Sequence, residues 1–455
     1  MRSVAAQQKA QQKAQRKTHQ RKQQYQRRQA RQHARPQPRL VHPVEMPANQ
    51  GAAPCAGLLP YVRFLRHHLH LPLLLADLAL KEKGYRLVSL VLVLLCRPQL
   101  GCASVNQLRA RLAHRFIQRL FTLSYAHQRG ASVDILYDLL AQLDPALLEQ
   151  GFTRHLQQLR RRGLLFPNRQ GYLDSTLMAN RPHTTFENAA WTKMRGVSVF
   201  GFKLFLLVDV ATKTLLYVRF ATMAHTDVSA LIPAVQAVQR LGFRLTHLGF
   251  DRGFWSGDNF KFLQRQRIAF FTVLKNYQQE HRDLLQAITS RTPQRQQLKD
   301  GVWITEVEPI RLNTYFTTKT LRCIVVRQKG HLPWAIITNE TELSKADIVR
   351  FYEHRNLVEK VIEELKNDYA LQKLPRKAFR DNTCYVLLTL WSYNLLADYK
   401  LTVLKNQVAL FQQLKSLRSL LFDFAAVVFY RRCGLYLSFE ITHPLQANIM
   451  AFNQL

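Results

Sequence analysis

The feature that most constrains the fold is a succession of short apolar segments that begins after Phe166. β-Branched and aromatic residues form strand-like runs between residues 171 and 274, and helix-like segments separate the later runs. The predicted order is strand, strand, strand, helix, strand, helix, strand. Continuous apolar runs such as KLFLLV are typical of strands that are buried on both faces of a sheet. This segment therefore predicts an α/β fold, a mixed sheet with helices on its faces.

The pattern gives approximate bounds for each element. The predicted strands are 171–175, 200–210, 215–222, 247–250 and 268–274, and the predicted helices are 228–240 and 258–267. Thr226 or Asp227 is the expected N-cap of the first helix. A different stretch follows, polar at first and then alternating, with strands expected at 302–307, 321–327 and 334–338. Residues 275–344 are therefore expected to form a β-rich insertion.

The regions on either side of the sheet have helical periodicity. Residues 41–166 place apolar residues at three- and four-residue steps, and 132–162 predicts two helices broken near Asp144 and Pro145. A helical DNA-binding region and a helical packing domain with a solvated basic end are equal interpretations. In the first interpretation the DNA contacts are Arg160, Arg161 and Arg162, at the end of the second helix. Residues 401–455 are expected to be helical.

The charge of the chain points to an anionic partner. Lys and Arg number 65 against 30 Asp and Glu, which gives a net charge of +35. Residues 1–40 form a Gln- and Arg-rich arm that we expect to be disordered; its 12 basic residues and no acid leave +23 to the rest of the chain. Nucleic acid is the usual partner of such a chain, and an anionic membrane surface is the weaker alternative.

Other features exclude several classes of protein. The longest apolar run, residues 87–95, is far shorter than the roughly 18 residues that a membrane span needs. The six cysteines are scattered, without the spacing of a zinc site or a disulfide framework. The polar, basic N-terminus predicts no signal peptide. We therefore expect a soluble protein of the cytoplasm.

One segment carries a candidate site. Residues 351–370 contain no Pro or Gly and predict one continuous helix. At about 100° per residue, four polar residues fall within about 60° of one another, namely Tyr352, Arg355, Glu359 and Lys366. The opposite face is apolar and fits a core. A carboxylate flanked by two cations and a phenol suits a site where metal and phosphate meet, although salt-bridged surface helices also carry such charges. Glu363 is an alternative carboxylate on the same face.

The four residues resemble the Y-x2-R-x3-E-x6-K signature of DDE transposases from a large group of bacterial insertion sequences. The flanking segments WAIITNETELSKADIVRFYEHR and ELKNDYALQKLP are also similar, and the resemblance extends over roughly residues 171–399. It selects Glu359 over Glu363 as the third acid. It also implies a ribonuclease-H-like catalytic core formed by residues 167–274 and 345–400.

The resemblance places the other two acids on strands. The family's first acid lies on the opening strand, where GYLDST gives Asp174, and its second acid ends the fourth strand, where LGFDRGFW gives Asp251. Asp209 is the main competitor for the first position. It would leave only one strand and one helix before Asp251, so we interpret it as a strand end or turn residue.

The resemblance implies a chemistry for this site. Asp174, Asp251 and Glu359 would bind two Mg²⁺ ions, with Mn²⁺ as a substitute, for DNA cleavage and cut-and-paste transfer of the 3′-OH. Members of the group often free their second strand through a hairpin, and the sequence leaves open whether this chain does so. Tyr352, Arg355 and Lys366 would contact phosphates. An aromatic residue would stack on a flipped base, with Trp303 as the candidate and Trp255 as the alternative.

The resemblance also implies partners and a location. These are the terminal inverted repeats of an element, target DNA, a homodimer in the synaptic complex, and the nucleoid in the cytoplasm. Two other functions are compatible with the sequence. One is a structure-selective nuclease of the same fold that stops after hydrolysis, and the other is a catalytically inert nucleic-acid-binding protein.

Overall fold

A computed structural model describes most of the chain. The described residues are 39–40, 52–53, 55–78, 85–123, 131–165, 167–180, 185–194, 196–274, 296–310, 321–404, 412–423, 426–431 and 434–438. The chain divides into two compact units, residues 1–59 with 423–455, and residues 60–422. The expected disordered arm of residues 1–40 lies outside the described residues except for Arg39 and Leu40.

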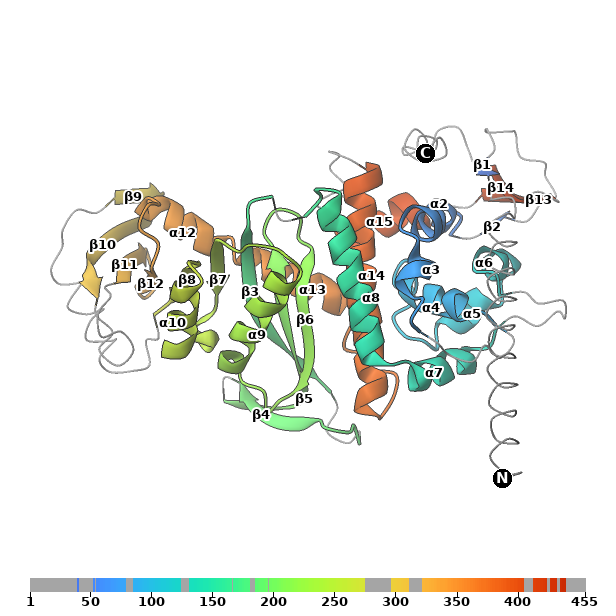
Figure 1. The fold of residues 1–455 in the computed structure, drawn as a ribbon, viewed down its shortest axis with the longest axis horizontal. Helices are drawn as coiled ribbons and strands as arrows, with labels where there is room; N and C mark the ends of the chain where they lie inside the picture. Colours follow the sequence, from blue (N-terminus) through green and yellow to red (C-terminus); the bar gives the residue numbers. More distant parts are fainter. Residues whose placement is uncertain are drawn as a thin grey trace, which may run out of the picture. The chain divides into compact units, whose positions relative to one another are not determined.

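The larger unit contains a ten-stranded sheet (Figure 1). The first six strands are β3 (Gln170–Ala179), β4 (Ala190–Met194), β5 (Val197–Asp209), β6 (Leu215–Thr222), β7 (His247–Phe250) and β8 (Ala269–Val273). β6, β5, β3, β7 and β8 lie in that order; β5 is antiparallel to β3 and β6, whereas β7 is parallel to β3 and β8. This is the strand order of the ribonuclease-H-like fold, so the expected fold class is confirmed.

Four further strands extend the same sheet. They are β9 (Gln296–Lys299), β10 (Val302–Ile310), β11 (Leu321–Gln328) and β12 (Trp334–Thr338). β12 pairs antiparallel with β8, and β11, β10 and β9 follow as antiparallel neighbours. The expected strands of residues 275–344 therefore form, and they are hydrogen-bonded to the core sheet instead of standing apart from it.

Helices cover both faces of the sheet. α9 (Asp227–Arg240), the 3-10 turn η2 (Arg252–Phe254) and α10 (Gly257–Arg265) lie on one face, and α12 (Lys345–Glu353) and α13 (Asn356–Asn367) lie on the other. The alternation of side chains along β3 separates the two faces. Tyr172 donates a hydrogen bond to the carbonyl oxygen of Phe351 in α12, whereas Ser175 contacts Asp227 in α9.

The expected single helix of residues 351–370 is wrong in one respect, because it breaks between α12 and α13. Around the break, the amides of Arg355, Leu357 and Val358 each donate to the carbonyl three residues earlier, at 2.9–3.0 Å. These i to i−3 bonds tighten the backbone over one turn, so the side chains no longer advance by a regular 100° per residue around one helix axis. The α12 residue Tyr352 is therefore buried at 8% exposure, while the side chain of Glu359 in α13 is 52% exposed.

The N-terminal part of the larger unit is helical. Its elements are α2 (Leu58–Arg63), the π-helix η1 (Phe64–His68), α3 (Leu71–Leu74), α4 (Leu87–Leu95), α5 (Leu108–Leu112), α6 (Arg115–Leu120), α7 (Val133–Gln142) and α8 (Pro145–Arg161). The expected break near Asp144 is confirmed, because Asp144 caps α8 by accepting a hydrogen bond from the amide of Ala146. α8 packs along the long helix α14 (Phe379–Tyr399) (Figure 1).

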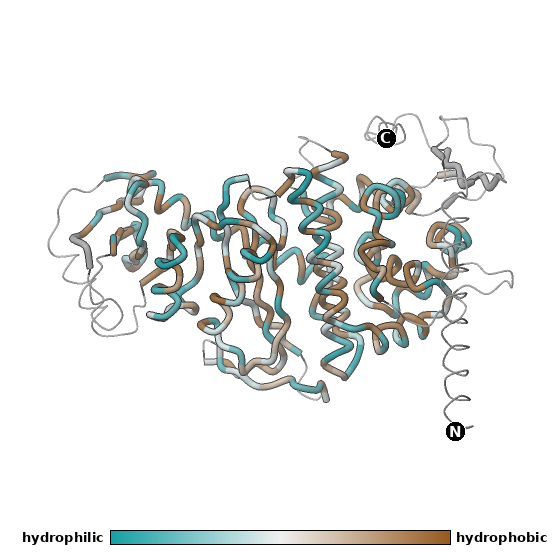
Figure 2. The backbone as a smooth tube through the Cα atoms, viewed as in Figure 1, coloured by the Kyte–Doolittle hydropathy of each residue, from teal (hydrophilic) through white to brown (hydrophobic). Residues whose placement is uncertain are grey.

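The longest apolar run forms core. All residues of α4 except Val88 are buried, and Figure 2 shows this helix among the most hydrophobic segments of the chain. None of the described helices is both long enough and apolar enough to cross a membrane.

The C-terminal region departs from the helical expectation. Helical turns occur at η3 (Lys400–Leu404), α15 (Leu414–Leu417) and η5 (Arg418–Phe422). The smaller unit then contains β13 (Ala426–Arg431) and β14 (Gly434–Ser438), which pair with each other and with β2 (Ala52–Ala53) and β1 (Arg39–Leu40). The expectation of helix is thus wrong for 426–431 and 434–438. The run AVVFYR is rich in β-branched and aromatic residues, and a glycine begins the next strand, so strand propensity prevails over general apolarity.

Candidate active site

The centre of the sheet brings the first two predicted acids together. β3 and β7 are adjacent parallel strands, and Leu173 of β3 is in register with Phe250 of β7. Asp174 and Asp251 are the next residues along their strands, and neighbouring strands lie about 4.8 Å apart. Asp251 follows the last residue of β7, where its carboxylate accepts a hydrogen bond from the amide of Arg252.

The third acid reaches this point through Arg355, the N-cap residue of α13. One nitrogen of the guanidinium donates to Oδ2 of Asp174 at 3.0 Å, and the other donates to Oε1 of Glu359 at 2.5 Å. The Arg355 side chain is 17% exposed. A strand carboxylate and a helix carboxylate that are 185 residues apart in the chain therefore share one cation.

The pKa of Asp174 is shifted by its surroundings. Burial raises the pKa of this carboxyl to about 6, and the charge of Arg355 and the amide of Ser175 oppose the rise. The negative charges of Asp251 and Glu359 raise the pKa further. The carboxyl of Asp174 therefore lies within electrostatic range of both other acids.

The other signature residues line the same region. Lys366 Nζ donates to Oγ1 of Thr176 at 2.5 Å, and Thr176 lies two residues beyond Asp174 on β3. The guanidinium carbon of Arg355 lies 5.9 Å from the ring centroid of Tyr352. Burial raises the pKa of the Tyr352 hydroxyl well above its usual value, so this group remains a neutral phenol.

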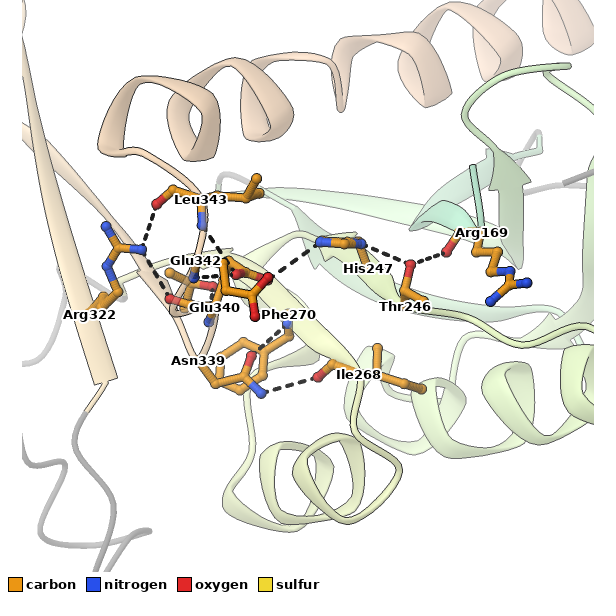
Figure 3. A network of polar contacts seen from close by, with 11 residues as sticks. Arg169, Thr246, His247, Ile268, Phe270, Arg322, Asn339, Glu340, Glu342 and Leu343 are labelled. Atoms are coloured by element: carbon orange, nitrogen blue, oxygen red, sulfur yellow. Dashed lines mark hydrogen bonds and ion pairs between the residues drawn. The ribbon is translucent and has the colours of Figure 1, made fainter. Parts of the chain in front are cut away.

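A network of polar contacts fixes the start of α12 (Figure 3). Asn339, directly after β12, accepts from the amide of Phe270 at 2.7 Å and donates to the carbonyl of Ile268 at 3.1 Å. Arg322 of β11 donates to the carbonyl oxygens of Glu340 and Leu343. The β12–α12 connection is therefore held against the strands that lie beside it, and this fixes the helix pair that carries Arg355 and Glu359.

The donor chemistry of the three acids fits a hard divalent cation. Mg²⁺ binds carboxylate oxygens and retains waters, and all three of these side chains are carboxylates. Within the described residues, no set of three or more Asp, Glu, His or Cys residues lies close enough to form a metal site without rearrangement. The guanidinium of Arg355 stands between Asp174 and Glu359.

The rival acids have different surroundings. Asp209 is fully buried at the end of β5 and accepts from the hydroxyl of Thr212 at 2.5 Å and from the amide of Ala211. Asp209 pairs with Gly171, whereas Asp174 pairs with Leu206. Asp209 therefore lies three residues, or about 10 Å along the strand, from the position opposite Asp174. Glu363 is exposed on α13.

The three arginines predicted to contact DNA have different surroundings. Arg160 donates to the carbonyl of Leu241 and lies over the ring of Phe243, Arg161 is exposed, and Arg162 donates to Asp398 at 2.6 Å. Two of the three arginines thus make contacts within the protein.

The two tryptophans predicted to stack on a flipped base lie in different environments. Trp303 pairs with Arg327 across β10 and β11. Trp255 is buried at 4% exposure, with its ring against Phe260.

Two residues near the site were missed from the sequence. Trp334 of β12 packs on Tyr352, with ring centroids 5.9 Å apart. The pairing of Trp334 with Val326 places it on the face of the sheet opposite to Trp303. Tyr172 holds the last turn of α12 through its hydroxyl, and its ring fills the space where a side chain on Gly249 would lie. The only sequence signal was the position of Trp334 within the segment WAIITN.

The raised pKa of Asp174 predicts a pH-dependent stability effect. Because the folded-state pKa lies above the value near 3.8 of the free group, ionisation of Asp174 destabilises the fold as the pH rises through about 6, by about 3 kcal/mol at most. Asp174→Asn should therefore raise the melting temperature by a few degrees at pH 7.5 and leave it unchanged near pH 4. Thermal melts across this range test the effect, and a lower melting temperature of the variant at pH 7.5 would contradict it.

Comparison with known proteins identifies the family. The sequence model of the transposase DDE domain matches residues 166–395, about half of the chain. No curated protein matches the sequence. Among solved structures, a piggyBac transposase synaptic complex with hairpin DNA has a TM-score of 0.44 and 14% identity, and covers 82% of this chain and 81% of its own. The Mos1 strand transfer complex has a TM-score of 0.16 and 13% identity, with 42% and 59% covered. The match over residues 166–395 shows that this chain belongs to the transposase DDE domain family.

Proposed function

We propose that this protein is a transposase of the bacterial insertion-sequence group with the Y-R-E-K signature. It would cut DNA at the ends of its element and join the freed 3′-OH to target DNA. The observation that carries the proposal is the convergence of Asp174 and Glu359 on one guanidinium, with Asp251 on the adjacent strand. Acidic side chains from three separate elements that face one region of the sheet are what a two-metal phosphoryl-transfer site needs.

Asp174, Asp251 and Glu359 are the proposed ligands of two divalent cations, Mg²⁺ or Mn²⁺. When bound, such a pair supplies charge that activates the attacking oxygen and stabilises the leaving oxygen of a phosphodiester. The three carboxylates must be ionised for this role. Because Arg355 opposes the rise in the pKa of Asp174, it helps to keep that carboxyl in the ionised form.

The basic residues of the site are the proposed phosphate contacts. Arg355 offers a planar guanidinium that can donate to two phosphate oxygens. Lys366 of α13 offers a point charge, and its ammonium group bonds to Thr176, two residues beyond Asp174 on β3. Both side chains now bond to protein oxygens, which a phosphate oxygen would replace. We propose Trp303 and, from its contact with Tyr352, Trp334 as candidates for stacking on a flipped base if the second strand is freed through a hairpin.

The remaining parts of the proposal concern assembly. The partners are the terminal inverted repeats and target DNA, with Arg160, Arg161, Arg162 and the N-terminal arm as further candidate contacts. The active form is a homodimer that holds two ends in a synaptic complex. The place of action is the nucleoid in the cytoplasm.

The proposal is tested with a labelled duplex that carries the inverted repeat flanking the gene. Incubation with Mg²⁺ should yield cleavage at the repeat end, followed by joining of the labelled 3′-OH to a target plasmid. Cleavage without joining would support a structure-selective nuclease instead. Specific binding of the repeat without any cleavage in Mg²⁺ or Mn²⁺ would overturn the enzymatic proposal and favour an inert DNA-binding protein.

A further inference from the structure

A further acid, Asp227 of α9, lies against the face of β3 opposite to Asp174. Ser175 follows Asp174 and projects to the opposite side of the sheet, where its hydroxyl donates to Oδ1 of Asp227 at 2.6 Å. Asp227 is the first residue of α9, and Thr226 caps that helix by accepting from the amide of Ser229. The backbone of Asp227 is therefore fixed by the start of α9, and its carboxylate bonds to Ser175, the residue after Asp174.

The same carboxylate packs against the turn that follows Asp251. A Cβ placed on Gly253, two residues after Asp251, would lie 2.5 Å from Oδ2 of Asp227. This glycine has no left-handed conformation to explain it, so the requirement is one of space. Asp227 thus touches Gly253 with one oxygen and Ser175 with the other.

A lysine also contacts this carboxylate. Lys203 Nζ of β5 lies 2.7 Å from Oδ1 of Asp227, and the two side chains are 15% and 23% exposed. The ammonium group also lies over the ring of Phe205, 5.4 Å from its centroid. With the lysine and the serine on one oxygen, the other oxygen is directed at Gly253.

We propose that Asp227 is a positioning residue that sets the distance between Asp174 and Asp251. Its carboxylate is in contact with the residue after the first acid and with the turn after the second, while it contacts neither acid itself. The inference rests on the proposed function, because the distance matters only if the two aspartates share metal ions. Residues that orient metal ligands typically change metal affinity by 10- to 100-fold when replaced.

The first test compares Asp227→Ala with Asp258→Ala. Asp258 is the exposed acid in the first turn of the neighbouring helix α10, so it controls for loss of a charge near a helix start. Mn²⁺ affinity is measured by electron paramagnetic resonance on the full chain bound to the repeat duplex. Asp227→Ala should weaken Mn²⁺ binding at least tenfold with unchanged DNA affinity, Asp227→Asn by less than threefold because an amide oxygen still accepts from Ser175, and Asp258→Ala not at all.

The second test uses the close contact with Gly253. Gly253→Ala should weaken Mn²⁺ binding because the new methyl group pushes the carboxylate away. In the double variant Asp227→Ala/Gly253→Ala the obstruction is gone, so its Mn²⁺ affinity should equal that of Asp227→Ala alone. Chemical denaturation of each variant separates these effects from loss of folding.

The outcomes distinguish the two proposals. Unchanged Mn²⁺ affinity in Asp227→Ala, or additive losses in the double variant, would overturn the positioning role. Metal binding that follows the predicted pattern in a protein that never cleaves DNA would support the positioning role and overturn the proposed function.

Discussion

Asp174→Ala, Asp251→Ala and Glu359→Ala are each expected to lower the rate of Mg²⁺-dependent cleavage at the repeat end by 10³-fold or more. Loss of one ligand removes several kcal/mol of charge stabilisation from the transition state, and each 1.36 kcal/mol is worth a factor of about ten. The affinity for the repeat duplex should stay within about twofold of the wild-type value, because the proposed phosphate contacts are Arg355 and Lys366 and these are retained. Single-turnover cleavage and a binding titration measure the two quantities.

Glu363→Ala is the matched control for the third acid. Glu363 lies one turn beyond Glu359 on α13 and is exposed, and only Glu359 bonds to the guanidinium that also holds Asp174. Its replacement should change the cleavage rate by less than twofold. Inactivity of Glu363→Ala together with full activity of Glu359→Ala would exchange the two assignments.

Arg355→Ala is expected to produce the second large effect, a loss of roughly 10²-fold in cleavage at pH 7.5 together with a shifted pH profile. Arg355 lowers the pKa of Asp174 against the effect of burial, so its removal should raise that pKa above the present value of about 6. More of the Asp174 carboxyl is then protonated at a given pH, and the acidic limb of the pH–rate profile moves to higher pH.

A lysine at position 355 retains the positive charge but lacks the planar guanidinium that donates to two acceptors at once. Arg355→Lys should therefore restore the position of the acidic limb in part, while the rate stays low because an ammonium group cannot bond to Asp174 and Glu359 in the present geometry. Arg350→Ala is the control, since Arg350 on α12 pairs with Asp347 at the surface. An unchanged acidic limb in Arg355→Ala would show that Arg355 does not control the ionisation of Asp174.

Much of the sheet could be predicted from local sequence. The strands Leu215–Thr222, His247–Phe250 and Trp334–Thr338 have the predicted bounds, because apolar runs that end in turn-forming residues define strands locally. The Asp144–Pro145 break is also local, since a capping aspartate and a proline at the first helical position specify a helix start.

The break between α12 and α13 depends on tertiary contacts and was missed. His354 and Arg355 are compatible with a continuous helix, and nothing nearby in the sequence disfavours one. Long-range interactions fix the end of α12, namely the hydrogen bond from Tyr172 to Phe351 and the packing of Trp334 on Tyr352. Such contacts join residues far apart in the chain, and a periodicity argument does not include them.

In the candidate site, too, local sequence identified some features, whereas others depend on long-range contacts. A fixed spacing within α12 and α13 made Arg355 and Glu359 recognisable, and short motifs at strand ends did so for Asp174 and Asp251. The role of Arg355 as a bridge between two acids follows only from the fold. Asp227 looked like an ordinary acid at a helix start, because its contacts with Ser175 and Gly253 come from other elements.

The most direct test of the central claim is a crystal structure of the protein with its repeat duplex and Mn²⁺, with anomalous scattering used to locate the metal. We expect Mn²⁺ peaks within bonding distance of Asp174, Asp251 and Glu359, with Arg355 moved from these acids to a phosphate. Ordered DNA at the site, with Mn²⁺ absent from these three carboxylates or bound elsewhere, would contradict the account.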